Sequence, residues 1–131
     1  MCMAPLNIKY PSKKVNPGSS ATIRLEVPCG KCVECLQDRR EMWSLRIAEE
    51  WKDHNDSAFI TLTYSDENLT YGEYLPSLVK SDLQNWFKRL RDKIKPIKVR
   101  YYAVGEYGTK TLRPHYHVIL FGLPLQKIKD G

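Results

Sequence analysis

The 131-residue sequence has no apolar run near the ~18 residues that a membrane-spanning helix needs, and its N-terminus lacks the basic-then-apolar pattern of a signal peptide. It also has no internal repeat and no low-complexity tract. These absences argue against a membrane or secreted protein, so we expect a cytoplasmic protein without a membrane partner. Its hydrophobic share of 42% and aromatic share of 11% exclude a disordered tail. The length suits one domain or a fragment of a larger protein.

Acidic residues are fewer than basic ones, 15 against 21, so the formal net charge is +6. The excess is concentrated in the stretch from Lys88 to Arg100, which contains seven basic side chains and one acidic side chain. Such a cluster favours a polyanionic partner, because each phosphate that it neutralises releases condensed counterions. We therefore predict Lys88, Arg89 and Arg91 as nucleic-acid contacts. A solvated helix face would have the same charge pattern, and charge alone does not separate the two interpretations.

Cysteine is scarce, yet three of the four cysteines lie in one segment, Cys29-Gly-Lys-Cys32-Val-Glu-Cys35, with Cys2 as the fourth. In a chain without an export signal, this density favours a metal over disulfides. Four thiolates would suit a tetrahedral Zn²⁺ ion, and Gly30 would allow the tight turn between two of them. We predict a structural zinc site; the alternative is four reduced, half-buried thiols.

The hydrophobic pattern divides the chain into two parts, 1–57 and 58–131. The first part is expected to contain an irregular arm at 1–20, rich in Pro, Gly, Ser and Lys, then a strand at 21–27 and a helix at 33–52. Apolar residues recur at helical spacing along that helix, and its tryptophans are expected in the core; the residues are Leu36, Trp43, Ile47 and Trp51.

The second part has the order strand, helix, strand, strand. We expect strands at 58–64, 99–106 and 115–122, and a helix that ends before Pro96. Ser81 and Gln84 match a capping box at the start of this helix. The predicted fold is α+β, an antiparallel sheet flanked by helices of the split βαβ kind. Because that fold needs a further helix and strand, we expect the chain to be cut short at its C-terminus.

Two of the three histidines, His115 and His117, stand two residues apart in a predicted strand. Residues at this spacing point to the same face, so both imidazoles could bind one divalent ion. If Glu106 lies opposite His115 across the hairpin, its carboxylate joins them. Two imidazoles and a carboxylate form a recognised set for a catalytic divalent ion with open coordination positions. The alternative is a pair of half-buried strand histidines satisfied by hydrogen bonds.

The His115-Tyr-His117 motif and its hydrophobic flank resemble motif two of the HUH endonucleases, the rolling-circle replication initiators and relaxases, and Phe59-Ile-Thr-Leu-Thr-Tyr64 resembles their first motif. A larger set resembles the replication initiators of microviruses of the gokushovirus type. That set comprises Val-Pro-Cys-Gly-Lys-Cys32, Arg39-Arg40, Thr61-Leu-Thr-Tyr64, Lys88-Arg-Leu-Arg91, Val104-Gly-Glu-Tyr-Gly108 and Arg113-Pro-His-Tyr-His117.

This resemblance implies a Mg²⁺ or Mn²⁺ ion held by His115, His117 and a third polar ligand, which we assign by position to Glu106. It implies a rolling-circle initiator that nicks and rejoins single-stranded DNA at a viral origin through a phosphotyrosine intermediate. The partners would be that DNA, with Arg113 as a further contact, and the host replication machinery. The location would be the cytoplasm of a bacterial host.

In the resembled family, the nucleophilic tyrosine lies downstream of the histidine strand, but no tyrosine follows His117 here. We therefore expect the nucleophile beyond Gly131, and expect this chain to bind metal and DNA with little or no covalent nicking. The alternative function is a non-catalytic, zinc-stapled module that binds single-stranded nucleic acid by charge and stacking, with Tyr101, Tyr102 and Tyr116 as stacking candidates.

Overall fold

The computed structural model describes residues 1–11, 18, 22–124 and 126. The chain divides into two compact units, Met1–Arg46 and Ile47–Gly131, which are described separately. None of the helices in the described residues combines the length and the apolar character needed to cross a membrane.

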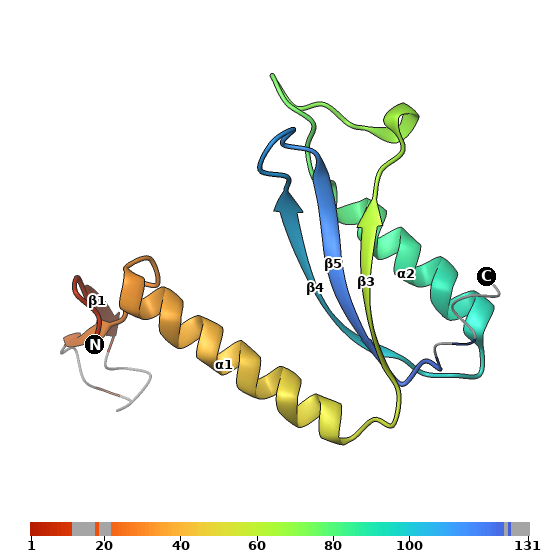
Figure 1. The fold of residues 1–131 in the computed structure, drawn as a ribbon. Helices are drawn as coiled ribbons and strands as arrows, with labels where there is room; N and C mark the ends of the chain where they lie inside the picture. The colour runs from red at the N-terminus through yellow and green to blue at the C-terminus, as the bar shows by residue number, and fades with distance from the viewer. Residues whose placement is uncertain (12–17, 19–21, 125, 127–131) are drawn as a thin grey trace. The chain divides into compact units, whose positions relative to one another are not determined.

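The second unit is built on a three-stranded antiparallel sheet of β3 (Ser57–Thr63), β4 (Arg100–Tyr107) and β5 (Pro114–Phe121). The strand order is β3-β5-β4, so β5 is the central strand and pairs with both neighbours (Figure 1). A short 3-10 helix, η2 (Asp66–Asn68), follows β3. The helix α2 (Lys80–Ile94) lies along one face of the sheet. The α+β prediction is confirmed, and the expected strands and second helix agree with the structure to within one residue at almost every end.

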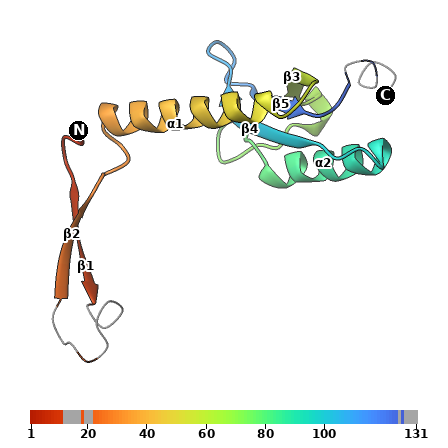
Figure 2. The same cartoon turned by 90° about the horizontal axis from the view of Figure 1, so that it is seen from below.

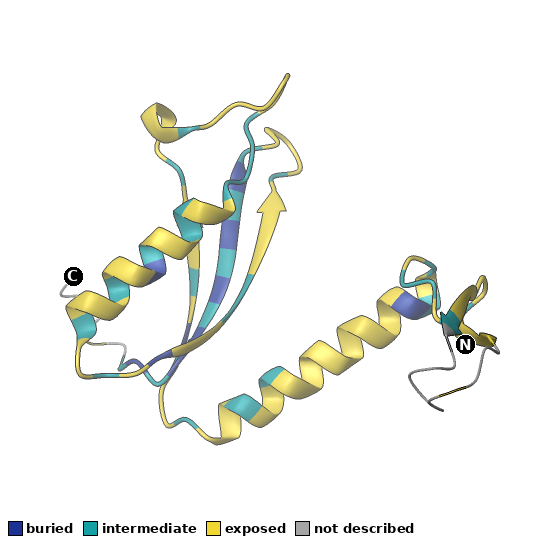
Figure 3. Cartoon of the chain, turned by 180° about the vertical axis from the view of Figure 1, so that it is seen from behind, coloured by how far each residue is buried: buried dark blue, intermediate teal, exposed yellow. Residues whose placement is uncertain are grey.

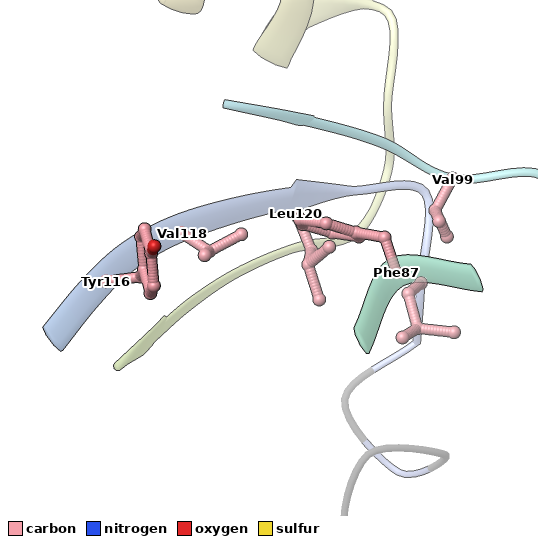
Figure 4. Close-up of a cluster of buried hydrophobic side chains, with 6 residues drawn as sticks. Phe87, Val99, Tyr116, Val118 and Leu120 are labelled. Atoms are coloured by element: carbon pink, nitrogen blue, oxygen red, sulfur yellow. The ribbon is translucent and has the colours of Figure 1, made fainter. Parts of the chain in front are cut away.

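The core lies between α2 and the face of the sheet that it covers. Alternate residues of β5 are buried, which is visible as alternating bands along that strand (Figure 3). Tyr116, Val118 and Leu120 project from β5 toward Phe87 of α2, whose side chain is 1% exposed (Figure 4). Val99 completes the cluster from the segment before β4. The two-residue period of β5 therefore gives the sheet one covered face and one face of different character.

The first unit contains a second, two-stranded antiparallel sheet of β1 (Leu6–Pro11) and β2 (Thr22–Val27), seen side by side in Figure 2. The helix α1 (Val33–Lys52) begins shortly after β2 and contributes its first part to this unit. The prediction of an irregular arm at 1–20 is wrong for β1, because its alternating side chains pair in register with the whole of β2. The remainder of that predicted arm, apart from residues 1–5 and 18, lies outside the described residues.

Two further expectations are wrong. The helix α2 starts at Lys80 with Val79 as its N-cap and has no side-chain capping bond, so Ser81 and Gln84 form no capping box. Its first turn is closed by backbone instead, with the Asp82 amide donating to the Val79 carbonyl at 3.0 Å. The tryptophans of α1 are exposed, Trp51 by 64%, and do not form a core.

Candidate metal centre on the open face of the sheet

The strand register determines which side chains of β5 share the face away from α2. Pro114, Tyr116, Val118 and Leu120 are buried on the α2 side, so the residues between them point the other way. His115 and His117 are therefore neighbours on the second face, with ring centroids 4.9 Å apart in an edge-on arrangement. The two imidazoles are partly accessible, with side chains 20% and 28% exposed.

Glu106 joins this pair from β4. The register places it directly opposite His115, as the predicted hairpin requires. Its Oε2 lies 3.1 Å from Nε2 of His117 and 3.7 Å from Nε2 of His115. Each of the three residues offers one ligand atom, and all three atoms lie within 4.8 Å of one another. The structure thus brings the three predicted metal ligands together on one face, with both Nε2 atoms directed at one carboxylate.

The opposite nitrogen of each imidazole has its own hydrogen-bond partner. Nδ1 of His115 lies 3.2 Å from the backbone carbonyl of Arg113, and Nδ1 of His117 lies 3.1 Å from Oγ1 of Thr61 on β3. A carbonyl can only accept, so Nδ1 of His115 carries the proton and Nε2 keeps its lone pair. The Thr61 hydroxyl can accept from His117 in the same way. This arrangement is the one that orients metal-binding histidines in proteins.

The face around the three ligands carries exposed apolar side chains. Phe59 stacks on the ring of His117, with centroids 5.4 Å apart and planes 19° apart, yet 67% of Phe59 is exposed. Val104, which pairs with His117 from the other side, is also exposed. A ligand that approaches the two histidines therefore meets an aromatic ring beside them. The third histidine, His54, belongs to the other end of the sheet, where its Nε2 lies 2.7 Å from Glu50.

The predicted nucleic-acid contacts do not lie together at this centre. Lys88, Arg89 and Arg91 are exposed on α2, which covers the opposite face of the sheet. The guanidinium of Arg91 lies over the rings of Phe87 and Tyr101, 5.9 and 5.6 Å from their centroids. The basic cluster and the metal-ligand set thus belong to two different layers of the unit.

Arg113 is engaged by the chain itself. Its Nη1 donates to Oδ1 of Asp66 at 2.6 Å, and its Nη2 donates to the carbonyl of Tyr64 at 2.5 Å. These bonds fasten the segment after β3 to the start of β5. Arg113 therefore positions the loop beside the histidines, and its backbone carbonyl orients one of them.

A cavity of about 530 Å³ lies between β3 and α2 and was not foreseen from the sequence. Its lining combines aromatic rings with polar groups and includes Tyr64, Asp82, Trp86, Arg89 and Tyr116. Burial of the phenol, with a smaller contribution from Tyr116, raises the pKa of Tyr64 above its ordinary value. Tyr116 is buried here, so it is not available as the exposed stacking platform considered for the binding-module alternative.

The second cluster of candidate ligands lies in the first unit, where Cys2, Cys29, Cys32 and Cys35 bring their sulfur atoms within 4.8 Å of one another. The backbone amides of Lys31 and Cys32 donate to Sγ of Cys29 at 3.4 and 3.3 Å. These two hydrogen bonds lower the pKa of Cys29 to about 6.

Comparison with known proteins gives a family match over residues 57–130, to the family of the replication-associated protein ORF2. The replication-associated protein ORF2 of Spiroplasma virus 4 is 41% identical over 108 residues, which cover 79% of this chain and 34% of that protein. The replication-associated protein VP4 of Bdellovibrio phage phiMH2K is 34% identical over 130 residues, covering 88% and 36%.

A third relative, the replication-associated protein ORF4 of Chlamydia phage 1, is 35% identical over 99 residues, which cover 73% of this chain and 24% of that protein. The matches thus span about a third or less of the length of these curated relatives. No solved structure gives a significant match to the chain.

Proposed function

Because the chain belongs to the ORF2 family of replication-associated proteins, we propose that it carries the metal-binding half of an HUH-type initiator. In this proposal the whole protein nicks and rejoins single-stranded DNA at a replication origin. The observation that carries the proposal is the convergence of His115, His117 and Glu106, with both Nε2 atoms within 3.7 Å of one carboxylate oxygen.

The chemistry of these donors fits Mg²⁺ or Mn²⁺. Two neutral imidazoles and one carboxylate on a single face leave coordination positions open for substrate oxygens, as a catalytic ion requires. A divalent ion held there would act as a Lewis acid on a phosphate group of the DNA. The ligands sit on an accessible sheet face rather than in a closed cage, which also suits an open site and a polymeric substrate.

The side chains around the ligands have separate tasks in this proposal. The Arg113 carbonyl and the Thr61 hydroxyl hold the imidazole rings so that Nε2 of each faces Glu106. The exposed ring of Phe59 offers an unpaired base a surface on which to stack beside His117. A nucleophilic tyrosine downstream of the histidine strand is not among the residues of this chain.

Manganese binding tests the proposal directly. We would titrate Mn²⁺ into the full 131-residue chain and follow free Mn²⁺ by electron paramagnetic resonance. The change of His115 and His117 together to Ala should weaken Mn²⁺ binding at least ~10-fold, since loss of even an outer-shell partner costs ~10- to 100-fold. Glu106→Gln removes the charge at nearly constant shape and should weaken it similarly.

Glu67→Gln is the matched control, because it makes the same chemical change at an exposed glutamate of η2. This variant should bind Mn²⁺ as the unmodified chain does. If the double histidine variant binds Mn²⁺ as tightly as the unmodified chain, the metal centre is not where the three side chains converge and the proposal is wrong.

One observation favours a second candidate, a non-catalytic module that binds single-stranded nucleic acid. The exposed basic residues of α2 lie on the layer away from the histidines, so DNA could bind there without a metal. Fluorescence anisotropy with a labelled oligothymidylate separates the two functions. The binding module predicts no Mn²⁺ site and the same DNA affinity with and without Mn²⁺, whereas the initiator predicts tighter DNA binding with Mn²⁺ that the double histidine variant loses.

A further inference from the structure

The first unit has almost no apolar core. Among the described residues of Met1–Arg46, Cys35 is the one buried residue. The large apolar side chains of the hairpin are exposed, namely Leu6, Ile8, Ile23 and Leu25. An isolated two-stranded hairpin is marginally stable at best in water, and units of this size usually need a disulfide, a metal or a partner. Hydrophobic burial therefore does not explain why this unit has a defined structure.

The four cysteines converge at the base of that hairpin, from three separate stretches of chain. Cys2 precedes β1, Cys29 follows β2, and Cys32 and Cys35 lie at the start of α1. Each pair of sulfur atoms is within 4.8 Å, with Sγ of Cys2 and Sγ of Cys32 separated by 3.8 Å. All four thiols are free. A single ion at this position would tie both strands and the first turn of α1 together.

The backbone around the thiols is already arranged for charged sulfur. The amides of Lys31 and Cys32 donate to Cys29 Sγ, and the Cys29 amide donates to Cys2 Sγ at 3.3 Å. Gly30 has a φ of 73°, the left-handed conformation that the turn between Cys29 and Cys32 requires. Amide donors of this kind stabilise thiolates, and a set made only of thiolates suits Zn²⁺ in a closed tetrahedral site.

We propose that Cys2, Cys29, Cys32 and Cys35 bind one Zn²⁺ ion as four thiolates and that this ion holds the unit Met1–Arg46 together. The site is structural, because all four ligands come from the protein and no coordination position is left for a substrate. Binding releases the protons of those ligands that are still thiols, and the ion has no redox chemistry. The proposal does not depend on the metal centre of the second unit.

Cobalt substitution tests the ligand set. The reduced, metal-free full chain should take up one Co²⁺ per chain, with the thiolate charge-transfer and visible d–d absorption of a tetrahedral site, and one equivalent of Zn²⁺ should bleach both. The variant with His115 and His117 changed to Ala should give the same spectrum, so the test is independent of the proposed initiator function. A chain that shows no tetrahedral thiolate spectrum, or forms disulfides instead, would overturn the proposal.

The contribution of Cys2 is tested by Cys2→Ser, which should weaken Zn²⁺ binding at least about tenfold, as expected when one of four thiolates is lost. Met3→Ser is the matched control at the next residue, since the Met3 side chain is exposed, and it should leave Zn²⁺ affinity unchanged. Equal affinities in the two variants would show that Cys2 is not a ligand.

Hydrogen exchange of the unmodified chain shows what the ion does for the fold, without relying on a variant that fails to fold. Removal of Zn²⁺ with a chelator should abolish the protection of amides in β1 and β2 while those of β5, held in the core with Phe87, keep theirs. Unchanged protection of β1 and β2 after the ion is removed would contradict the proposed structural role.

Discussion

The hydrogen bond between Thr61 and His117 gives the sharpest quantitative test of the proposed metal centre. Thr61→Val keeps the shape and the β-branched character of the side chain but removes Oγ1, which lies 3.1 Å from Nδ1 of His117. An exposed bond between two neutral groups contributes about 0.5–1.5 kcal/mol net, and 1.4 kcal/mol corresponds to a factor of ten. We therefore expect Mn²⁺ affinity to fall about 2- to 10-fold, measured by electron paramagnetic resonance of free Mn²⁺.

Thr63→Val is the matched control, because Thr63 is on the same face of β3 and pairs with His115, whose Nδ1 bonds instead to the Arg113 carbonyl. It should leave Mn²⁺ affinity unchanged. Thr61→Ser retains a hydroxyl and should bind Mn²⁺ more tightly than Thr61→Val. The ¹⁵N shifts of His117 should report an Nδ1–H tautomer that Thr61→Val depopulates. Equal Mn²⁺ affinities for the two valine variants would refute the positioning role of Thr61.

Two further predictions concern α2 and the core. Changing Lys88, Arg89 and Arg91 together to Ala should weaken oligothymidylate binding and flatten the slope of log affinity against log salt by about 2, as loss of three phosphate contacts does; an unchanged slope would make this cluster a solubilising face. Phe87→Ala should lower the free energy of unfolding by about 3–5 kcal/mol in a denaturant titration, because Phe87 is 1% exposed and stacks on Tyr101. Phe59→Ala, the same change on the exposed face, should cost far less, and similar losses for both would contradict the assignment of the two faces.

The elements of the second unit could be predicted because their signals are local. The two-residue period of β5 and the helical spacing of α2 are present in the sequence itself, and both elements formed as expected. The hairpin between β4 and β5 is also a short-range feature, so the opposition of Glu106 and His115 followed from counting residues across one turn. Local periodicity therefore predicted most of the sheet and the side chains that share its open face.

The features that were missed depend on segments far apart in the chain. Thr61 meets His117 through a pairing of strands 56 residues apart, and no local pattern states the register of β3 against β5. The capping box failed because Leu78, just before α2, is held by the Tyr107 hydroxyl, which accepts from its amide at 3.1 Å, so the helix starts at Lys80. Tertiary contacts overrode a local preference in both cases.

The separation of charge and ligands onto two layers has a consequence for how DNA would be used. Lys88 and Arg89 cannot reach a phosphate at the histidine face from the opposite side of the sheet, so they do not polarise the group that would react there. Their contribution is sequence-independent attraction, which raises the local concentration of DNA. Discrimination of the DNA site must come from groups beside the ligands, and among the described residues Phe59 is the one aromatic ring stacked on a histidine ligand. Removal of the basic cluster should therefore weaken binding to all sequences alike and leave Mn²⁺ affinity unchanged, whereas changes at His117 and its neighbours should do the reverse.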